Sequence, residues 1–471
     1  MNTQARPVSG SPVPLVINGR DVTTERTFPV ISPISTSEIW TCSSARSEHL
    51  AEAVSSAHNA FQAWSATKPS TRRDIFLRAA EVIAERREEL GGYMHQEIGA
   101  DKAYQDFILG LTIEGLKDTA GKIAGALQGE VPVSNHDGRR AVIYKRPYGV
   151  VLGIGPWNAP YHLGFRAVTF ALAAGNTTIL KGPELSPRCY WAIADVFRQA
   201  GLPDGCLNLI FHRPEDAGPV TEQLVKNVHV RKINFTGSSH VGSIIAALAG
   251  KHLKPCLMEL GGKASAIVMP DADLDTAALS CAAGQICMST ERILVHSSVA
   301  AAFQSLLGRA VRRTFEGPSN TPRVITAGSA KRNRALVAQA LSKGGEVLHG
   351  GSDATPANGT ETMMPPVILT KMTKEMDLYQ SESFGPSVSL FTFDTEDEAI
   401  ELANDTPYGL SAAVFTEDLK LALRVADRLE SGAVHINSMT VHDELALPHG
   451  GIKNSGFGRF NGYHGLDEFL Y

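Results

Sequence analysis

The chain has 471 residues, of which 43% are hydrophobic and 20% charged. This composition is typical of soluble globular proteins, and the length is enough for two or three domains. The formal net charge of −5 gives no basic field, so we expect no nucleic-acid partner. No apolar run approaches the roughly 18 residues of a membrane span, and the N-terminus lacks the features of a signal or transit peptide. We therefore expect a cytoplasmic protein with no membrane partner.

The six cysteines are scattered along the chain without CxxC spacing. In a long chain of this kind, such scatter argues against both a disulfide framework and a zinc site. We therefore expect no metal, and each cysteine has to be considered by itself.

The first clearly periodic segment predicts an amphipathic helix over residues 71–98. Apolar residues recur at spacings of three and four, as in Phe76, Ile83 and Leu90. The charged run ERREE at 85–89 falls mostly on the opposite face of this helix. We interpret the run as solvation of an exposed surface.

Two series of short apolar runs alternate with helical stretches from residue 147 onward. The first series is VVLGI (150–154), TTIL (177–180), LNLI (207–210) and INF (233–235); the second is AIVM (266–269), RILVH (292–296), VSLFTF (388–393), AAVF (412–415) and AVHIN (433–437). Gly175 and Gly201 stand where two crossover helices should end. Repeated strand–helix units predict two doubly wound parallel-sheet domains of the α/β class.

Polar residues and glycines follow the predicted strands of the first domain, where ligands of an open parallel sheet bind. The segments are GPWN (155–158), KGPE (181–184) and TGSSHVG (236–242). The last matches neither a Walker loop nor GxGxxG, so it is either a phosphate site at a helix N-terminus or a turn with Ser238 as N-cap. Lys181 and Glu184 either bind ribose hydroxyls or are ordinary exposed charges.

Two further candidates lie near the junction of the two domains. Glu259 precedes a glycine pair in MELGGK, where a carboxylate is either a cap or a general base with a raised pKa. Cys287 lies in GQICMSTER, in a predicted loop before a strand. A cysteine there is either a nucleophile or one more buried small residue. Cys281, six residues earlier, is expected to pack a helix.

Seven motifs, in order and at matching separations, resemble the aldehyde dehydrogenase superfamily from about residue 15 to the end of the chain. They are PWN (156–158), K..E (181–184), FTGS..VG (235–242), ELGGK (259–263), GQ.C (284–287), E.FGP (382–386) and P.GG.K.SG.GR (448–459). GQICMSTER and RAV...ALAAGNTTILK are most similar to the vanillin, benzaldehyde and salicylaldehyde dehydrogenase group.

The resemblance implies a role for each matching residue in the NAD-dependent oxidation of an aldehyde to an acid. Cys287 would be the nucleophile, Asn158 with the Cys287 N–H would stabilise the oxyanion, and Glu259 would be the base for thioester hydrolysis. The implied cofactor residues are Lys181 and Glu184 at the adenine ribose, Trp157, Gly237 and Ser238 at the pyrophosphate, and Glu382 with Phe384 at the nicotinamide ribose. Glu184 favours NAD over NADP because it would repel a 2′-phosphate.

The resemblance also implies a domain plan and an assembly. Residues 1–126 and 147–258 would form a Rossmann-like NAD-binding domain, and residues 259–437 the catalytic domain. Residues 127–146 and 438–471 would form a small β element for oligomerisation, in a homodimer or homotetramer.

The small-molecule aldehyde is expected in a tunnel whose walls include Tyr161, Arg166, Met288 and the loop 435–451. Arg166 either attracts a phenolate or carboxylate of the substrate or forms a structural ion pair. Two positions depart from the family pattern. Phe460 stands where many members have a glutamate in a proton path, and His449 stands where Phe is usual.

Three alternatives to an aromatic aldehyde dehydrogenase remain open from the sequence. The enzyme could have broad or aliphatic specificity, or it could be of the CoA-acylating type. The CoA-acylating type typically lacks the base at position 259, so Glu259 counts against it. A non-catalytic NAD-binding protein is disfavoured by the complete set of catalytic positions.

Overall fold

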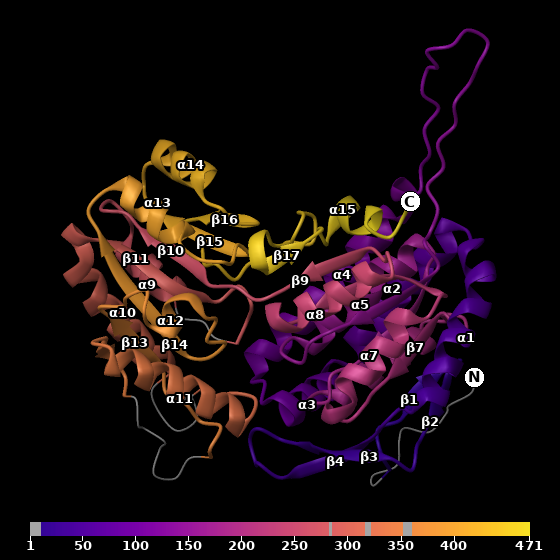
Figure 1. The fold of residues 1–471 in the computed structure, drawn as a ribbon, viewed down its shortest axis with the longest axis horizontal. Coiled ribbons are helices and arrows are strands. Elements are labelled where there is room, and N and C mark those ends of the chain that lie inside the picture. The colour runs from indigo at the N-terminus through magenta and orange to yellow at the C-terminus, as the bar shows by residue number, and fades with distance from the viewer. Residues whose placement is uncertain (1–10, 282–284, 316–321, 352–359) are drawn as a thin grey trace.

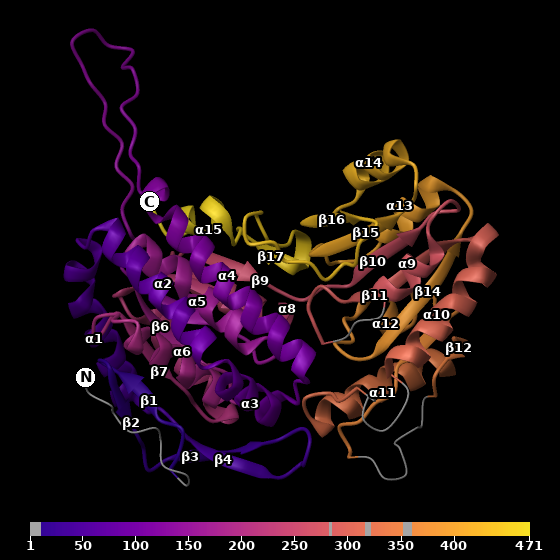
Figure 2. The same cartoon turned by 180° about the vertical axis from the view of Figure 1, so that it is seen from behind.

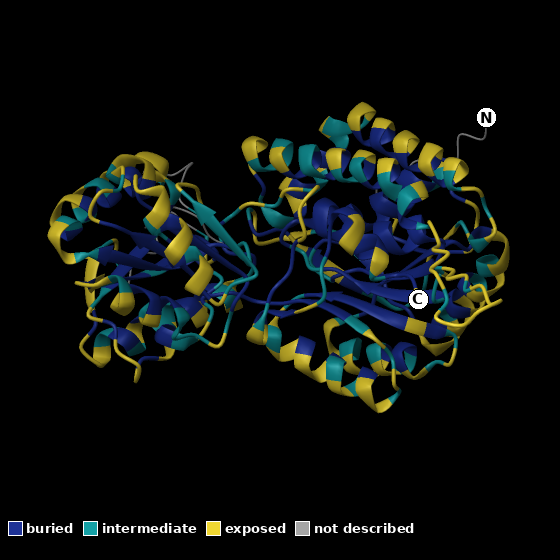
Figure 3. Cartoon of the chain, turned by 90° about the horizontal axis from the view of Figure 1, so that it is seen from above, coloured by how far each residue is buried: buried dark blue, intermediate teal, exposed yellow. Residues whose placement is uncertain are grey.

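Two separate sheets, each covered by helices on both faces, organise the chain (Figures 1 and 2). The computed structural model describes residues 11–281, 285–315, 322–351 and 360–471. The two predicted α/β domains are confirmed. In the view of Figure 3, the strands inside each domain are buried and the outer helices expose only one side, as expected for amphipathic helices.

The first sheet has the order β17-β9-β8-β5-β6-β7-β1-β2, and its five strands from β9 to β7 are parallel. Its strands are β1 (Leu15–Ile17), β2 (Arg20–Val22), β5 (Val150–Ile154), β6 (Thr177–Lys181), β7 (Leu207–Ile210), β8 (Val230–Thr236), β9 (Cys256–Glu259) and β17 (Gly456–Phe457). Every residue of β5, β6 and β7 is buried, which explains why these strands appear in the sequence as continuous apolar runs.

The helices of the first domain are α1 (Ser47–Ser65), α2 (Pro69–Glu85), α3 (Arg87–Ile98), α4 (Lys102–Ala126), α5 (Pro160–Ala174), α6 (Pro187–Gln199), α7 (Ala217–Lys226) and α8 (Ser239–Lys251). A separate hairpin consists of β3 (Thr27–Ile31) and β4 (Glu38–Ser43). Helix α5 begins with Pro160 at its first turn and ends at Gly175, whose φ of +97° suits glycine.

The second sheet has the order β12-β13-β14-β11-β10-β15-β16, with only β12 antiparallel. Its strands are β10 (Ala264–Val268), β11 (Thr290–His296), β12 (Glu346–His349), β13 (Val367–Thr370), β14 (Ser387–Phe393), β15 (Ser411–Phe415) and β16 (Ala433–Ile436). Its helices are α9 (Leu274–Ser280), α10 (Ala300–Phe315), α11 (Ala327–Ser342), α12 (Asp377–Gln380), α13 (Glu396–Asn404) and α14 (Leu419–Arg428). The predicted boundary at residue 259 falls at the last residue of β9, just before the connection to β10.

The predicted helix over 71–98 is wrong in one respect, because the structure breaks it at Arg86 into α2 and α3. The Arg86 side chain is only 14% exposed, and its guanidinium pairs with Glu89 at 3.0 Å and with Asp195 of α6 at 2.7 Å. The charged run is therefore not solvation alone. One of its members fixes the helix bend against a neighbouring helix.

The segment between α4 and β5 extends from the body as a long arm, and the chain ends beside its base (Figure 1). Arg146 and Tyr471 exchange two backbone hydrogen bonds of 2.9 and 2.8 Å there. Earlier in the same C-terminal segment, β17 pairs with β9, and α15 (Gly462–Asp467) packs on α4 and α5. Part of the predicted oligomerisation element thus packs on the first domain.

Candidate active site

The carboxyl ends of β9, β8, β5 and β6 are neighbours along one edge of the first sheet. The predicted residues occur along this edge in the same order: Glu259 ends β9, Gly237 and Ser238 follow β8, Trp157 and Asn158 follow β5, and Lys181 and Glu184 end and follow β6. Motifs that are about 100 residues apart in the sequence therefore become adjacent in space.

A cavity of about 300 Å³ lies between this edge and the second domain. Its walls bring together eight of the predicted residues: Trp157, Asn158, Gly237, Ser238, Glu259, Cys287, Glu382 and Phe384. The first five come from the first sheet and the other three from the second domain. Lys181 and Glu184 lie one strand further along the edge. The site is therefore built by both domains together.

Cys287 lies at the wall of this cavity, on the loop that leads into β11. Its thiol donates to Glu259, with 3.4 Å between Sγ and Oε1. The Asn158 amide donates to the Gln285 carbonyl oxygen at 3.1 Å. A β-carbon at Gly262 would lie 2.3 Å from the Cys287 carbonyl oxygen, so only glycine lets the two segments approach this closely.

The charges around Glu259 hold this carboxylate ionised. Burial opposes its ionisation, but Arg166 and His449 outweigh burial and lower its pKa to about 2. Burial and then the Glu259 charge raise the pKa of the Cys287 thiol well above its usual value, with Arg166 opposing them. At rest the pair is therefore a thiol beside a carboxylate. The proton of this thiol must leave before the sulfur can attack an electrophile.

Arg166 is a buried ion-pair residue. Its Nη2 contacts Glu259 Oε2, and its Nη1 contacts Asp443 Oδ2 at 2.8 Å. Its guanidinium also lies 4.6 Å from the centre of the Phe460 ring. Of the two readings that the sequence left open for Arg166, the structural ion pair is the arrangement observed, with Nη1 and Nη2 both bonded to carboxylates.

The other two predicted substrate residues are also buried. Tyr161 is 1% exposed, and its hydroxyl donates to the Leu90 carbonyl oxygen of α3 at 3.1 Å. This bond points the Tyr161 hydroxyl toward α3, and Tyr161 is not among the residues that line the cavity, so its place in a substrate tunnel stays a prediction. Met288 directly follows Cys287 in the sequence and is 8% exposed.

A buried carboxylate that the sequence analysis missed lies behind Arg166. Asp443 accepts hydrogen bonds from Arg166 Nη1 and His162 Nε2, both at 2.8 Å, and from Asn461 Nδ2 at 2.6 Å. His449 lies close by, with its Nε2 3.5 Å from Glu259 Oε1. The sequence analysis placed Asp443 only within the loop 435–451 and marked positions 449 and 460 as departures from the family pattern, without indicating this cluster.

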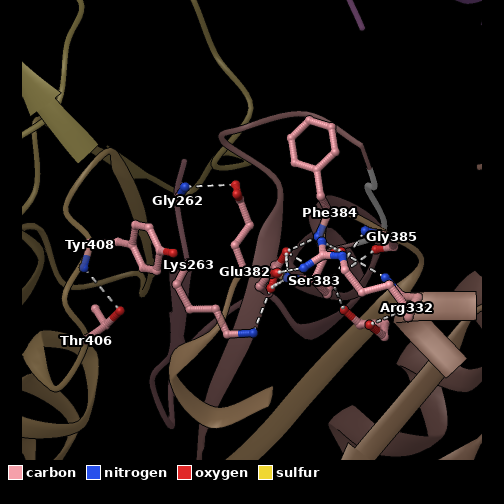
Figure 4. A network of polar contacts seen from close by, with 12 residues as sticks. Gly262, Lys263, Arg332, Glu382, Ser383, Phe384, Gly385, Thr406 and Tyr408 are labelled. Carbon is pink, nitrogen blue, oxygen red and sulfur yellow. Dashed lines mark hydrogen bonds and ion pairs between the residues drawn. The ribbon is translucent and has the colours of Figure 1, made fainter. Parts of the chain in front are cut away.

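Glu382 and Phe384 lie on a loop of the second domain that faces the first sheet. Glu382 accepts the backbone N–H of Gly262 at 2.9 Å, and burial followed by the Glu291 charge raises its pKa to about 7. The Phe384 and Trp157 rings pack edge to face, with 5.9 Å between their centres. In Figure 4 the Phe384 ring points away from the polar cluster beneath it. The loop therefore presents one carboxyl and one ring to the cavity.

A buried ion pair holds this loop in place. Lys263 contacts Glu291 at 2.6 Å, with side chains only 1% and 5% exposed. Glu291 also accepts the backbone N–H groups of Ser383 at 2.9 Å and Phe384 at 3.0 Å. These bonds tie together the residues after β9, the start of β11 and the 382–384 loop (Figure 4).

We expect Glu291→Ala to destabilise the protein by about 3–5 kcal/mol, because it leaves the Lys263 ammonium buried and unpaired. Urea unfolding followed by circular dichroism measures this change. The matched control is Glu346→Ala, which removes an exposed pair with Lys371 and should cost about 1 kcal/mol or less. Equal effects of the two variants would contradict this role for Glu291.

The cavity suits a dinucleotide at two places. Gly237 and Ser238 line it at the N-terminus of α8, where backbone N–H groups favour a phosphate. Ser238 is the N-cap of that helix and accepts the Val241 N–H, so the N-cap reading is confirmed and the phosphate site stays a prediction. The Glu382 carboxyl can bond ribose hydroxyls. A β-carbon at Gly261 would lie 2.5 Å from Glu382, so the glycine keeps this position open.

Two searches of the described part of the chain were negative. No described helix is long and apolar enough to cross a membrane. No group of three or more potential metal ligands comes together within the described ranges.

A thiol beside a buried carboxylate, in a cavity between two α/β domains, is an arrangement suited to an enzyme that uses a cysteine nucleophile. The family model of the aldehyde dehydrogenases matches residues 20–471. A vanillin dehydrogenase of a Pseudomonas species is 42% identical over 97% of this chain and 96% of its own. A salicylaldehyde dehydrogenase of Pseudomonas putida is 36% identical, over 95% and 94%.

Solved structures agree with these relatives. The crystal structure of a salicylaldehyde dehydrogenase from Pseudomonas putida, complexed with salicylaldehyde, has a TM-score of 0.93 and 35% identity over 97% of this chain and 96% of the other. The chain therefore belongs to the aldehyde dehydrogenase family, as the resemblance implied. It is an oxidoreductase of a family that uses NAD or NADP, and named relatives include enzymes of both kinds.

Proposed function

We propose that this enzyme oxidises an aromatic aldehyde to its carboxylic acid with NAD, through a thiohemiacetal and then a thioester on Cys287. The observation that carries the proposal is the Cys287 thiol 3.4 Å from the Glu259 carboxylate, at the wall of the cavity between the domains. NAD bound in this cavity would take the hydride from the thiohemiacetal.

The residues around the thiol divide the chemistry between them. Sulfur of Cys287 attacks the aldehyde carbon, and the Asn158 amide with the Cys287 N–H stabilises the oxygen that becomes negative. Glu259 removes a proton from the water that attacks the thioester. The carboxylate at position 259 supports hydrolysis over transfer of the acyl group to CoA.

The aromatic substrate is supported by the relatives, whose names include vanillin and salicylaldehyde dehydrogenases. A panel of benzaldehydes, hydroxybenzaldehydes and short aliphatic aldehydes tests this choice. We expect kcat/KM for the best aromatic member to exceed that of the aliphatic aldehydes at least about tenfold, with NADH formed in the absence of CoA. Preference for aliphatic aldehydes would overturn the substrate class, and strict CoA dependence would overturn the hydrolytic mechanism.

NAD is proposed over NADP because of the charges at the end of β6. Lys181 is 8% exposed, and its pKa is lowered to about 8 by burial, which the nearby Glu184 charge opposes. Both side chains suit the ribose hydroxyls of NAD. The Glu184 carboxylate would repel a 2′-phosphate, so the panel repeated with NADP should give slower rates.

We propose a homodimer or homotetramer because of the arm between α4 and β5. Its exposed apolar side chains are Val131, Val133, Val142, Ile143 and Tyr144, with exposed fractions from 49% to 97%. An extended arm with this many apolar side chains in water is typical of a segment that packs on another subunit. A second copy of the chain is the proposed partner.

A further inference from the structure

The Glu259 carboxylate contacts three side chains at the inner end of the cavity. Cys287 and His449 lie on the side of Oε1, at 3.4 and 3.5 Å, and Arg166 contacts Oε2. The contact with Cys287 belongs to the chemistry proposed above, and Arg166 keeps Glu259 ionised. The part played by His449 is unassigned.

The backbone of His449 is held by hydrogen bonds, but the Nε2 atom of its ring makes none with the residues that the structure describes. Its backbone exchanges two hydrogen bonds with Phe460, of 3.0 and 2.7 Å, and the residue is 6% exposed. Among the described residues, Nε2 of His449 has no hydrogen-bond partner. At 3.5 Å from Glu259 Oε1 it is just beyond a good hydrogen bond, so a small movement or one bridging water would connect them. A buried polar atom kept without a partner suggests a function.

Two more histidines continue from His449 toward the surface. His435 on β16 lies near enough to both His449 and His442 for their charges to interact. Within the described chain, its Nε2 also has no hydrogen-bond partner. The rings of His435 and His442 are 5.4 Å apart, and the His442 side chain is 49% exposed. His449 thus lies at the carboxylate, and His442, whose ring is next to that of His435, reaches solvent.

The charges facing His449 allow it to hold a proton for part of the cycle. They are Glu259 from β9, Arg166 and His162 from α5, Asp443 from the loop after β16, and His435. Burial lowers the pKa of His449, but Asp443 and Glu259 outweigh burial and raise the pKa above its usual value, with Arg166 opposing them. When Glu259 is protonated, one of the two stabilising charges disappears and the imidazolium can release its proton.

A proton path through position 460, where many family members have a glutamate, is not available in this chain. Phe460 is 1% exposed and lies against the Arg166 guanidinium, so it offers no group that exchanges protons. Hydrolysis of one thioester by one water produces a carboxylate, a restored thiol and one proton. That proton must leave a site where Glu259 is 1% exposed.

We propose that His449 receives the proton from Glu259 and passes it through His435 and His442 to solvent. This inference rests on the proposed function, in which Glu259 is the base for hydrolysis. Water's O–H bond breaks as its oxygen bonds the thioester carbon and its proton bonds Glu259. The C–S bond then breaks, and the proton of the carboxylic acid passes to the leaving sulfur, so that a carboxylate and the Cys287 thiol result. Finally the O–H bond of Glu259 breaks and an N–H bond forms at His449 Nε2; nothing is oxidised or reduced in these steps.

The test is rapid mixing of two variants with NAD and an aromatic aldehyde. His449→Ala should give a burst of about one NADH per active site at the wild-type rate, then a steady-state rate lowered at least about tenfold. Added imidazole should restore that rate, because the space of the lost ring can hold it. His449→Phe, which carries the residue usual in the family, should show the same burst and slow phase without rescue.

His252→Ala is the matched control. Its Nε2 also has no hydrogen-bond partner in the part of the chain that the structure describes, and it lies at the end of α8. This variant should keep both phases unchanged. A wild-type steady-state rate in either His449 variant, loss of the burst, or a slow phase in His449→Ala that imidazole leaves unchanged would overturn the proposal. Wild-type protein that forms no NADH would instead contradict the proposed function.

Discussion

Replacing Cys287 by alanine is expected to lower kcat for NADH formation by roughly 10⁴-fold or more, because Cys287 is the only thiol among the described residues that line the cavity. The variant should still bind NAD, since the residues proposed for the cofactor come from other segments that line the cavity. Steady-state absorbance at the NADH band measures the loss, and quenching of tryptophan fluorescence by added NAD measures the binding.

Cys281→Ala is the matched control for this prediction. Cys281 is also a cysteine near the same loop, but it is 4% exposed at the end of α9 and packs in the core of the second domain. This variant should retain nearly all activity. An active Cys287→Ala enzyme would mean that another group is the nucleophile.

Glu259→Gln is expected to separate the two halves of the reaction. The amide can still contact the thiol and Arg166 but cannot accept a proton, so one NADH per site should form and then hydrolysis should slow by about 10²–10⁴-fold. Stopped-flow absorbance resolves the burst from the slow phase. Because the pKa of Glu259 is about 2, the wild-type base is ionised near neutral pH, and no rise in activity with pH is expected from this group.

Glu259→Asp is the variant to compare with Glu259→Gln, because it keeps the carboxylate but shortens the side chain by one methylene group. Its steady-state rate should lie between those of the wild type and Glu259→Gln. Full turnover by Glu259→Gln would show that the base is elsewhere. The pair of variants therefore separates loss of charge from loss of position.

The strands that carry the site could be predicted from the sequence because they are buried on both faces. VVLGI and LNLI match β5 and β7 residue for residue, and polar residues follow β5, β6 and β8 where the sheet edge needs them. The motif residues meet in one cavity because parallel strands end at one edge. Local pattern and resemblance therefore predict the thiol, the carboxylate and the amide well.

What could not be predicted depends on partners far away in the sequence. The helix break at Arg86 depends on Asp195, which is 109 residues away. The position of Arg166 depends on Asp443, which is 277 residues away and lies in a loop without periodicity. A lone arginine or aspartate carries no sign of its partner, so the ion pair and the His449 contact emerge only from the fold.

Intact-protein mass spectrometry of the Glu259→Gln variant tests the central claim most directly. The protein is mixed with NAD and benzaldehyde and quenched in acid within the burst. One part is weighed intact, and the other is digested so that peptide masses locate the adduct. We predict a mass increase of one benzoyl group per chain, located on Cys287 and absent without NAD. Formation of NADH with no adduct on Cys287, or an adduct on another residue, would contradict the covalent mechanism.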